Sequence, residues 1–417
     1  MLLNRDRATT YMRENGLDAI VAASPVNVRY FTDYACWIAP LFREYMDSPG
    51  ASSELSQRNF AVLPLDGEPA LIVESMFAAT AADSWVTDIH PVGDAGFELP
   101  ASRHALPNGL QRIADAVQPA GSATAVDALV DALEERNLTD SRIGVELEAV
   151  PGRTARALSD RLPGAQLLDC SNMIRLIRAV KSGDELVRLE RAADIAEQAM
   201  QGALATVRPG RRAGEVTDRF RAEIAGSGAD FDHFAFGPRG VGIMTEGGYS
   251  FTDDDVSYVD FGCVYQGCFS DSGTTLFVGT PGDSLLRRHR AIRACLNAGS
   301  AAIRPGVKGS EVCVAMWDAL TEHGVAHSFP HGHGIGLEVR DYPIIVPDNG
   351  LRIQDDCVDV PSDLPFEAGM VVNLEAAVFI LGEASVHTEQ SYVITEEGVR
   401  QLTDQRREQP FVAASLV

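Results

Sequence analysis

The chain has 417 residues, of which 45% are hydrophobic and 23% charged, values typical of a soluble globular protein with two or three domains. Its formal net charge of -24 excludes nucleic acid as the expected partner, because phosphate binding requires a basic surface. Neither an N-terminal secretion signal nor an apolar run of 18 residues occurs, so we expect neither export nor a membrane span.

Seven cysteines occur in the chain, an odd number without the CxxC spacing of zinc or redox motifs. They indicate reduced thiols and therefore a cytoplasmic protein. Two of them, Cys263 and Cys268, are predicted to be packing residues, because no second pair of soft ligands accompanies them.

Residues 1–172 are predicted to form the first domain. Strand-like apolar runs alternate there with helix-like stretches, and the clearest runs are residues 19–23, 60–64, 70–73 and 142–146. This alternation predicts an α/β layout.

Residues 173–417 are predicted to form a second, α+β domain. Its first clear helix is predicted to begin after Ser182, because residues 182–185 (Ser-Gly-Asp-Glu) have the form of a capping box. Apolar residues then follow at helical spacing, at positions 186, 189, 193, 196 and 200.

An internal repeat lies within this second domain. Residues 207–216 (VRPGRRAGEV) match residues 303–312 (IRPGVKGSEV), and each copy joins two predicted helices through a Pro-Gly turn. One repeat of this type indicates two duplicated α+β halves related by a pseudo-two-fold axis, since a solenoid needs three or more copies. The alternative is a common turn used twice by chance.

Two aspartates, Asp260 and Asp271, flank a segment whose centre lies at residues 265–267 (Tyr-Gln-Gly). We interpret this segment as a β-hairpin in which the two aspartates lie directly opposite each other. Residues in that relation have Cβ atoms about 4.5–5.5 Å apart and side chains on the same face.

Glu375 and Glu389 repeat the arrangement, with their midpoint at Gly382 and a predicted strand on each side. Two opposed pairs of like charges repel unless positive charge lies between them, so a pair of divalent metal ions is the simplest interpretation. The alternative is that all four are solvated acids at hairpin ends. It is less favoured, because Asp and Glu are depleted within strands.

A fifth candidate ligand is His333, which lies between Gly332 and Gly334. Glycines on both sides let the backbone pass close to a crowded site. Four carboxylates and one imidazole suit Mn, Co, Fe or Zn in an open site. They do not suit a structural zinc, which prefers a closed set of Cys and His ligands.

These residues resemble the pita-bread metallopeptidases, the family of methionine aminopeptidase, aminopeptidase P and prolidase, whose fold creatinase and dimethylsulfoniopropionate lyase share. The resemblance extends to an N-terminal creatinase-like domain through residues 24–32 (SPVNVRYFT) and 178–185 (RAVKSGDE), so it covers nearly the whole chain. It implies two bound divalent metal ions, manganese first, and a homodimer. The implied ligands are Asp260, Asp271, His333, Glu375 and Glu389, with Asp271 and Glu389 bridging.

Two departures from the family pattern concern histidines. Peptidases of this fold carry one about 17 residues before the first ligand aspartate, where this chain reads GVGIMTEGG from Gly240. They carry another seven residues after the metal-binding histidine, where this chain has Arg340. Those histidines steady the peptide carbonyl and the tetrahedral intermediate, so ordinary Xaa-Pro peptidase activity is less strongly predicted. Arginine in that context is reminiscent of creatinase, where it holds a substrate carboxylate.

The leading hypothesis is a metal-dependent hydrolase that cleaves a C–N bond in a small, carboxylate-bearing substrate, with Xaa-Pro dipeptides as the default. Two divalent ions would activate a water, and Glu375 would accept its proton. Arg340 would hold the substrate carboxylate through its planar guanidinium, or else be an ordinary loop arginine. His331 or His327 would replace a missing catalytic histidine, unless they only pack in the loop.

Three further residues are weaker candidates for substrate binding. Arg239 is expected to point toward the pocket from the strand before the first aspartate. Trp37 and Tyr45 belong to an aromatic stretch that in the resembling dimers can wall the neighbour's pocket, although core packing is equally expected. The acidic segment 346–361 either lines the pocket entrance or lies on the surface.

Two other functions compete with hydrolysis. A lyase would remove a β-leaving group after proton abstraction by a site Asp or Tyr, and would need no histidine for a tetrahedral intermediate. A non-catalytic binding module, as in histone-chaperone relatives of the fold, is disfavoured because all five ligands are present. Elimination would give an alkene product, whereas a binding module would lack metal affinity.

Overall fold

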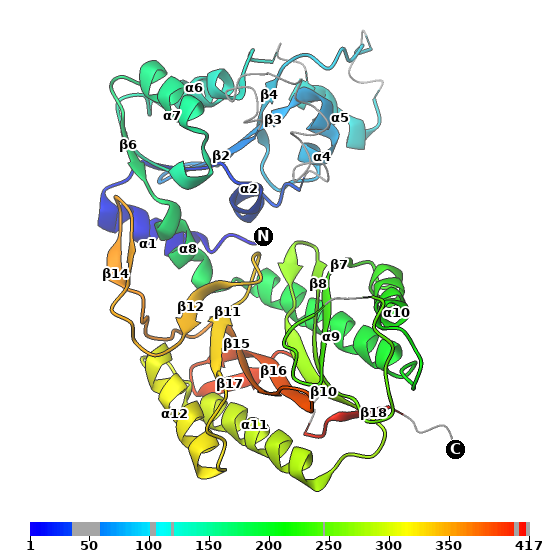
Figure 1. Cartoon of the computed structure of the whole chain (residues 1–417). Helices are drawn as coiled ribbons and strands as arrows, with labels where there is room; N and C mark the ends of the chain where they lie inside the picture. Colours follow the sequence, from blue (N-terminus) through cyan, green and yellow to red (C-terminus); the bar gives the residue numbers. More distant parts are fainter. Residues whose placement is uncertain (36–58, 101–105, 118–120, 245–246, 404–407, 414–417) are drawn as a thin grey trace. The chain divides into compact units, whose positions relative to one another are not determined.

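The computed structural model describes residues 1–35, 59–100, 106–117, 121–244, 247–403 and 408–413. They divide into two compact units, drawn in Figure 1. The first comprises Met1–Arg178 and Ile353–Asp359, and the second comprises Ala179–Arg352 and Val360–Val417. None of the described helices combines the length and the apolar character needed to cross a lipid bilayer.

The first unit is built on a six-stranded sheet of order β4-β3-β2-β1-β5-β6. Its strands are β1 (Ala19–Ala22), β2 (Phe60–Pro64), β3 (Ala70–Glu74), β4 (Asp88–Val92), β5 (Arg142–Val145) and β6 (Gln166–Asp169). Its helices are α1 (Arg5–Asn15), α2 (Pro25–Thr32), η3 (Ser75–Phe77), α4 (Ala78–Ala82), α5 (Asn108–Val117), α6 (Ala125–Glu135), η5 (Leu147–Ala149), α7 (Gly152–Arg161) and α8 (Ser171–Ala179). The predicted α/β layout and its four strands are confirmed.

The central strand β1 explains why this sheet needs helices around it. All four of its residues are buried, as expected for a strand covered on both faces. It pairs antiparallel with β2 and parallel with β5, so the sheet is mixed. Leu129 and Leu133 of α6 belong to the same buried cluster as Val21 of β1.

A short hairpin from late in the chain packs with the first unit. It consists of β13 (Arg352–Gln354) and β14 (Asp359–Pro361), within the acidic segment of the sequence. Asp355 Oδ2 accepts a hydrogen bond from the backbone N–H of Met173 at 2.9 Å, in the first turn of α8. A carboxylate is favourable there, because a helix N-terminus carries partial positive charge. The acids of this hairpin therefore have a structural role.

The boundary between the two compact units lies a few residues after the predicted domain boundary at residue 172. That position lies near the start of α8 (Ser171–Ala179), whereas the first unit continues to Arg178 at the other end of the helix. The sequence change at the capping box after Ser182 marks the next helix, α9 (Gly183–Leu204). There the predicted cap is confirmed, because Ser182 Oγ accepts from the Glu185 N–H at 3.2 Å and Glu185 Oε2 accepts from the Ser182 N–H at 2.9 Å.

The second unit is built on a ten-stranded sheet whose main path is β12-β11-β15-β16-β10-β8-β7, with β9, β17 and β18 added at its sides. The strands are β7 (Asp230–Pro238), β8 (Val256–Tyr265), β9 (Cys268–Phe269), β10 (Ser272–Val278), β11 (His331–Gly334), β12 (Asp341–Ile345), β15 (Val371–Ile380), β16 (Ala384–Thr395), β17 (Gly398–Gln401) and β18 (Phe411–Ala413). Besides α9, its helices are α10 (Ala213–Gly226), α11 (Asp283–Ala302) and α12 (Gly309–Glu322).

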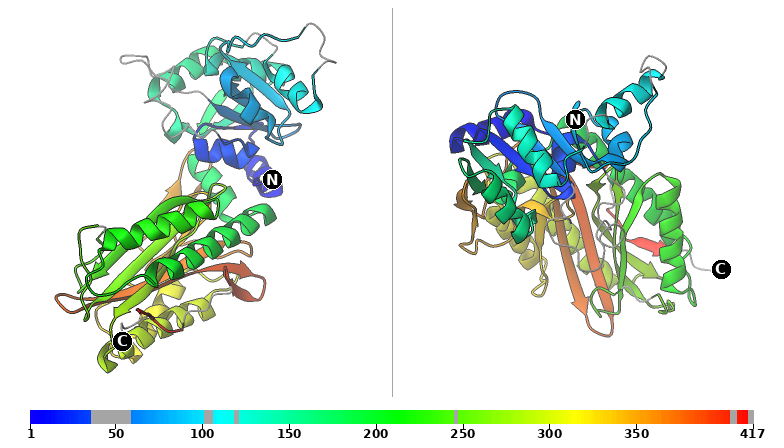
Figure 2. Two further views of the ribbon diagram at one scale, coloured as in Figure 1. Left: turned by 90° about the vertical axis from the view of Figure 1, so that its right-hand side faces the viewer. Right: turned by 90° about the horizontal axis from the view of Figure 1, so that it is seen from above.

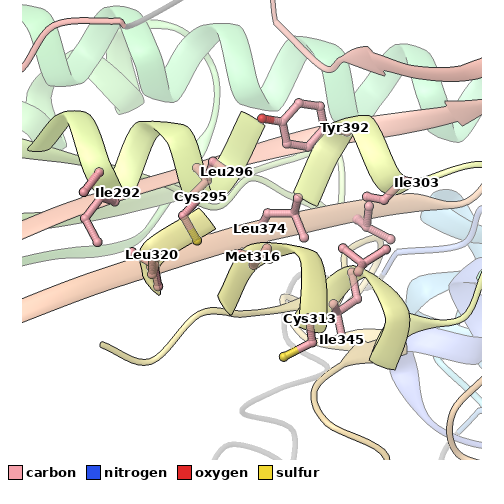
Figure 3. Packing of buried hydrophobic residues seen from close by; sticks show 14 of the residues in the cluster. Ile292, Cys295, Leu296, Ile303, Cys313, Met316, Leu320, Ile345, Leu374 and Tyr392 are labelled. Carbon is pink, nitrogen blue, oxygen red and sulfur yellow. The ribbon is translucent and has the colours of Figure 1, made fainter. Parts of the chain in front are cut away.

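Alternate residues of strand β15 face either the hydrophobic core or the opposite face of the sheet. On β15, Val372, Leu374 and Ala376 belong to the buried core. Figure 3 shows Leu374 among side chains of α11 and α12. Because successive residues of a strand point to opposite faces, the residues at 373 and 375 face away from these helices. Figure 2 shows α9 and α10 side by side on one face of the sheet. The other face is left for polar residues.

The internal repeat corresponds to two turns with the same hydrogen bonds. Gly210 N–H donates to Phe251 O at 2.7 Å, and Gly306 N–H donates to Phe366 O at 2.9 Å. Both glycines have φ near 85°, with values of 84° and 87°, a conformation that other residues rarely adopt. Each turn starts a helix, α10 or α12. The predicted duplication is therefore visible in the backbone itself.

Candidate metal centre

The glutamate hairpin has the predicted register. Glu375 on β15 lies directly opposite Glu389 on β16, and Ile380 opposite Ala384 closes the ladder before the turn. Gly382 lies in that turn with φ 82°. This register was predictable, because Gly382 is both the midpoint between Glu375 and Glu389 in the sequence and the residue at which a turn is expected.

The aspartate hairpin has a different register from the predicted one. Gly273 of β10, and not Asp271, lies opposite Asp260 of β8. The turn consists of Gln266 and Gly267, with φ values of 47° and 84°, the conformation of a two-residue type I′ turn. Asp271 therefore lies two positions before the residue that pairs with Asp260. An even displacement preserves the face, so both carboxylates still point to the same side.

Strand β11 brings histidines beside the glutamates. His331 lies opposite Glu375, and His333 lies opposite Asn373, on the neighbouring strand β15. The approach is close, because a Cβ on Gly332 would lie 2.3 Å from Asn373 O. The glycine next to His333 therefore allows the close backbone contact predicted from the sequence.

All five predicted ligands lie within one group of interlocking contacts. His333 is buried, and its Nε2 is 3.5 Å from Asp271 Oδ2. Among the described residues, three sets could each hold a metal ion, with ligand atoms within 4.8 Å of one another, and Asp271 and Glu389 each occur in two of them. The sets are His233, Asp260 and Asp271; Asp271, His333 and Glu389; and Glu375, His387 and Glu389.

Two histidines in these sets were not predicted. His387 precedes Glu389 by two residues, so strand alternation alone places both on one face, and this signal was available in the sequence. His233 on β7 lies 2.8 Å from Asp260 Oδ1 through Nε2 and 2.8 Å from Asp232 Oδ2 through Nδ1. A register shift between Phe231 and His233 redirects that strand, which a sequence pattern does not reveal.

The carboxyl groups have strongly shifted acidities. Burial, reinforced by the charge of Asp260, raises the pKa of Asp271 to about 8. Burial, followed by the charge of Asp271, raises the pKa of Glu389 well above its ordinary value. For Glu375, burial acts upward, but the contacts with His331 and His387 outweigh it and lower its pKa.

The site also contains buried polar atoms that have no hydrogen-bond partner among the described residues. They include Glu389 Oε2, His387 Nε2 and Asn373 Oδ1. Unsatisfied buried acceptors together with mutually repelling carboxyl groups are costly in the absence of a cation. Divalent cations with oxygen and imidazole ligands fit this donor set.

His331 and Arg340 lie together at the edge of the site. His331 Nε2 is 2.6 Å from Glu375 Oε1. Arg340 Nη2 is 3.5 Å from His331 Nε2 and 3.8 Å from Glu375 Oε1, and its side chain is 59% exposed. The ring of the exposed residue Phe329 lies against His331, with centroids 4.5 Å apart.

Arg239 does not lie with these residues. Ala235 of β7 is opposite Asp260, and Arg239 follows four residues later, about 13 Å further along the chain. Arg239 Nε donates to Asp255 Oδ1 at 2.8 Å, and Asp255 has a fully buried side chain. The predicted contact with substrate is therefore corrected to a structural ion pair.

The other predicted residues are placed as follows. His327 is exposed in the segment before β11. Trp37 and Tyr45 lie outside the described residues. Cys263 and Cys268 are buried, as predicted for packing residues.

Comparisons with known proteins identify the family. The sequence profile described as metallopeptidase family M24 matches residues 170–396, more than half of the chain. The chain belongs to metallopeptidase family M24. A second profile, described as the creatinase/prolidase N-terminal domain, matches residues 5–180. The resemblance and the fold class inferred from the sequence are thus confirmed, and this M24 chain is a metal-dependent hydrolase.

Individual M24 relatives cover most of the chain. The "uncharacterized peptidase YqhT" of Bacillus subtilis is 30% identical over 280 residues, which is 64% of this chain and 74% of the relative. The Xaa-Pro dipeptidase of Lactobacillus delbrueckii subsp. lactis is 24% identical over 97% of this chain and 98% of the relative. The solved structure of an Xaa-Pro dipeptidase from Bacillus anthracis has a TM-score of 0.71 at 21% identity and covers 98% of both chains. At that identity the solved structure establishes the fold.

The metal-free form of this M24 chain is expected to lose stability as the pH rises from 7 to 9. Burial alone would lower the pKa of His233, but the hydrogen bonds to Asp232 and Asp260 outweigh it and raise this pKa to about 10, well above the ordinary value for histidine. Asp271, with a pKa of about 8, also keeps its proton longer when folded than when unfolded. Each extra proton held by the folded state lowers stability by about 1.4 kcal/mol per pH unit as pH rises.

Urea unfolding of chelator-treated protein at pH 7, 8 and 9 measures this slope. His233→Asn is expected to make the slope between pH 8 and pH 9 shallower by the contribution of His233. Part of the slope should persist, because losing the charge of His233 raises the pKa of Asp271 further. Saturating Mn²⁺ is expected to reverse the trend, because the metal competes with these protons for the same groups. Metal-free protein that is equally stable at pH 7 and pH 9 would contradict the prediction.

Proposed function

We propose that this chain is a dinuclear-metal hydrolase that cleaves a C–N bond in a small, carboxylate-bearing substrate, with Xaa-Pro dipeptides as the first choice. The observation that carries the proposal is the group of four carboxylates and His333 on one face of one sheet, in which Asp271 and Glu389 are each shared by two candidate metal sets. The names of the dipeptidase relatives support the substrate class.

Asp260, Asp271, His333, Glu375 and Glu389 would hold two divalent ions, with Mn²⁺ as the first choice and Co²⁺, Fe²⁺ or Zn²⁺ as alternatives. Bound ions of this kind act as Lewis acids that polarise a carbonyl group and acidify water. Asn373 donates to Glu389 Oε1 at 2.5 Å, which fixes the orientation of that carboxylate. Such outer contacts hold ligands in place.

Glu375 and His331 would transfer the proton. The lowered pKa of Glu375 keeps this carboxylate ionised at neutral pH, as a proton acceptor requires. His331 Nε2, 2.6 Å from the ionised Glu375 Oε1, would donate the proton of this contact to the departing nitrogen, and Glu375 would then return to His331 the proton that it accepted from water. This pair would perform part of the role of the two histidines that the family pattern leads one to expect.

Arg340 would bind the carboxylate of the substrate. Its guanidinium is next to the His331–Glu375 pair, yet the side chain remains 59% exposed and can turn toward a ligand. A planar guanidinium can bind a carboxylate through two parallel hydrogen bonds. This arrangement favours substrates with a free carboxylate over amide-capped ones.

Elimination is the second candidate function. It would need a basic side chain to abstract a proton, and Tyr258, whose hydroxyl donates to Asp260 Oδ2 at 3.0 Å, is close enough to be considered. Burial raises the pKa of Tyr258 far above its ordinary value, so the phenol stays protonated and is a poor base. An aspartate would have to serve instead as the base.

The homodimer and the cytoplasmic location stay predictions.

The test is turnover of Xaa-Pro dipeptides by protein reconstituted separately with Mn²⁺, Co²⁺, Fe²⁺ and Zn²⁺. We expect hydrolysis of the free dipeptides with Mn²⁺, slower turnover of the same peptides capped as amides, and incorporation of ¹⁸O from labelled water. Xaa-Ala dipeptides serve as the matched control for proline. Protein that binds two metals per chain but cleaves none of these peptides would exclude dipeptidase activity, and an alkene product from other carboxylates would identify a lyase.

A further inference from the structure

His387 is buried in the site without a hydrogen bond to Nε2. It lies on β16, its side chain is completely buried, and no described group is a hydrogen-bond partner of its Nε2. Nε2 is 3.7 Å from Glu389 Oε2 and 3.8 Å from Glu375 Oε2. Both distances are too long for hydrogen bonds. The nitrogen and the two carboxylate oxygens therefore surround a small space.

Three strands hold this imidazole in place. Nδ1 is 3.4 Å from Val259 O, and the ring stacks on Tyr258 with centroids 4.0 Å apart and planes at 19°. Gly273 on β10 leaves room for the ring, because a Cβ there would lie 2.1 Å from His387 Cε1. A side chain held on several sides by β8, β10 and β16 cannot easily turn to find another partner.

The orientation also favours one tautomer. The carbonyl of Val259 is an acceptor only, so the nitrogen facing it, Nδ1, carries the proton. Nε2 then presents a lone pair toward Glu375 and Glu389, which suits a cation and not a hydrogen-bond acceptor. Histidines that bind metals commonly donate their other ring N–H to a backbone carbonyl in this way.

We propose that His387 is a further protein ligand of the metal centre and binds through Nε2 the ion held by Glu375 and Glu389. The inference rests on the proposed metal centre but adds a nitrogen to the five ligands that the family resemblance implies. A second imidazole makes the donor set softer. It should therefore strengthen the binding of Zn²⁺ and Co²⁺ more than that of Mn²⁺.

The decisive measurement is NMR of the full chain labelled with ¹⁵N in its nine histidines, with and without Zn²⁺. Binding of a metal to Nε2 shifts the resonance of that nitrogen, so the metal-bound histidines can be counted directly. We expect the signals of His333 and His387 to shift. Each is identified by its loss in the variant His333→Gln or His387→Gln. The buried His289 of α11, changed by His289→Gln, is the matched control and should leave the shifted signals unchanged.

Chelator competition on the same proteins gives an independent readout. Losing a ligand should cost at least as much affinity as losing an outer contact, so the Kd for Zn²⁺ should rise at least about 10- to 100-fold in His387→Gln. The Kd for Mn²⁺ should rise less. If His387→Gln fails to fold, the double variant His233→Gln/His331→Gln retains both proposed imidazoles and should still show two shifted signals.

A metal-loaded wild type whose shifted signals all survive in His387→Gln would overturn this inference and leave the proposed function intact. A single shifted histidine signal in the double variant His233→Gln/His331→Gln would likewise overturn this inference and leave the proposed function intact. Protein that binds no metal at all would overturn both. The metal content of each sample, measured alongside, separates these outcomes.

Discussion

Replacing Asp271 with asparagine is expected to remove metal from both candidate sets that share it and to lower kcat/KM by about a thousandfold or more. Asp271 is a member of the set with His233 and Asp260 and of the set with His333 and Glu389. An amide oxygen is neutral and ligates a divalent ion far more weakly than a carboxylate does. Loss of several kcal/mol of charge stabilisation by the metal corresponds to at least three powers of ten in rate.

The stability of the metal-free variant distinguishes this effect from misfolding. Burial and the charge of Asp260 make an ionised Asp271 unfavourable, so Asp271→Asn without metal should be at least as stable as the metal-free wild type at pH 8. Asp253→Asn is the matched control, because Asp253 is exposed on the loop before β8 and should alter neither metal content nor turnover. An Asp271→Asn protein that retains two metals and normal turnover would contradict the assignment.

Replacing Arg340 with alanine is expected to raise KM for carboxylate-bearing substrates by about 10- to 100-fold with a smaller change in kcat. A hydrogen bond to a charged group contributes about 1.5–3 kcal/mol, which corresponds to roughly 10- to 100-fold in affinity, and solvent screening of the exposed guanidinium keeps the bidentate contact near the value of one such bond. The guanidinium is mostly exposed and lies 3.8 Å from Glu375, so its removal leaves no buried cavity. The effect should therefore be on binding and not on folding.

Steady-state kinetics with free and amide-capped substrates test the assignment of Arg340. The amide-capped substrate should be affected little by Arg340→Ala, and Arg340→Lys should restore only part of the affinity, because lysine lacks the planar fork. Arg287→Ala, an exposed position on α11, is the matched control. Equal KM values for the free dipeptide in wild type and Arg340→Ala would rule out the carboxylate contact.

The grouping of the five candidate ligands was predictable from the sequence, because residue spacing in strands and hairpins determines which side chains lie on the same face of a sheet. The glutamate pair has the expected register around Gly382. The aspartate pair was placed two positions out of register, because pairing Asp260 with Asp271 puts the midpoint of the turn between residues 265 and 266, whereas the turn is centred between Gln266 and Gly267. The error was harmless to the site, since an even shift leaves side chains on the same face.

Other features depend on contacts that are distant in sequence. The ion pair of Arg239 with Asp255 requires the chain to return through the loop between β7 and β8. The place of His233 depends on the register shift within β7. The packing of Ile353–Asp359 with the first unit joins residues that lie some 180 positions from their partners at Asp169 and Met173. Local patterns contain no information on such partners.

The ring of His387 occupies space that is open only because residue 273 is glycine, so substitutions at positions 273 and 387 are not independent. A methyl group at residue 273 would collide with the imidazole at 2.1 Å, so a larger residue there is tolerated only after the histidine has been replaced by something smaller. The reverse substitution, a large ring at 387, is accessible only where residue 273 is already glycine. Any mutational path in this chain that changes both positions is therefore ordered, and the effect of either substitution depends on the other.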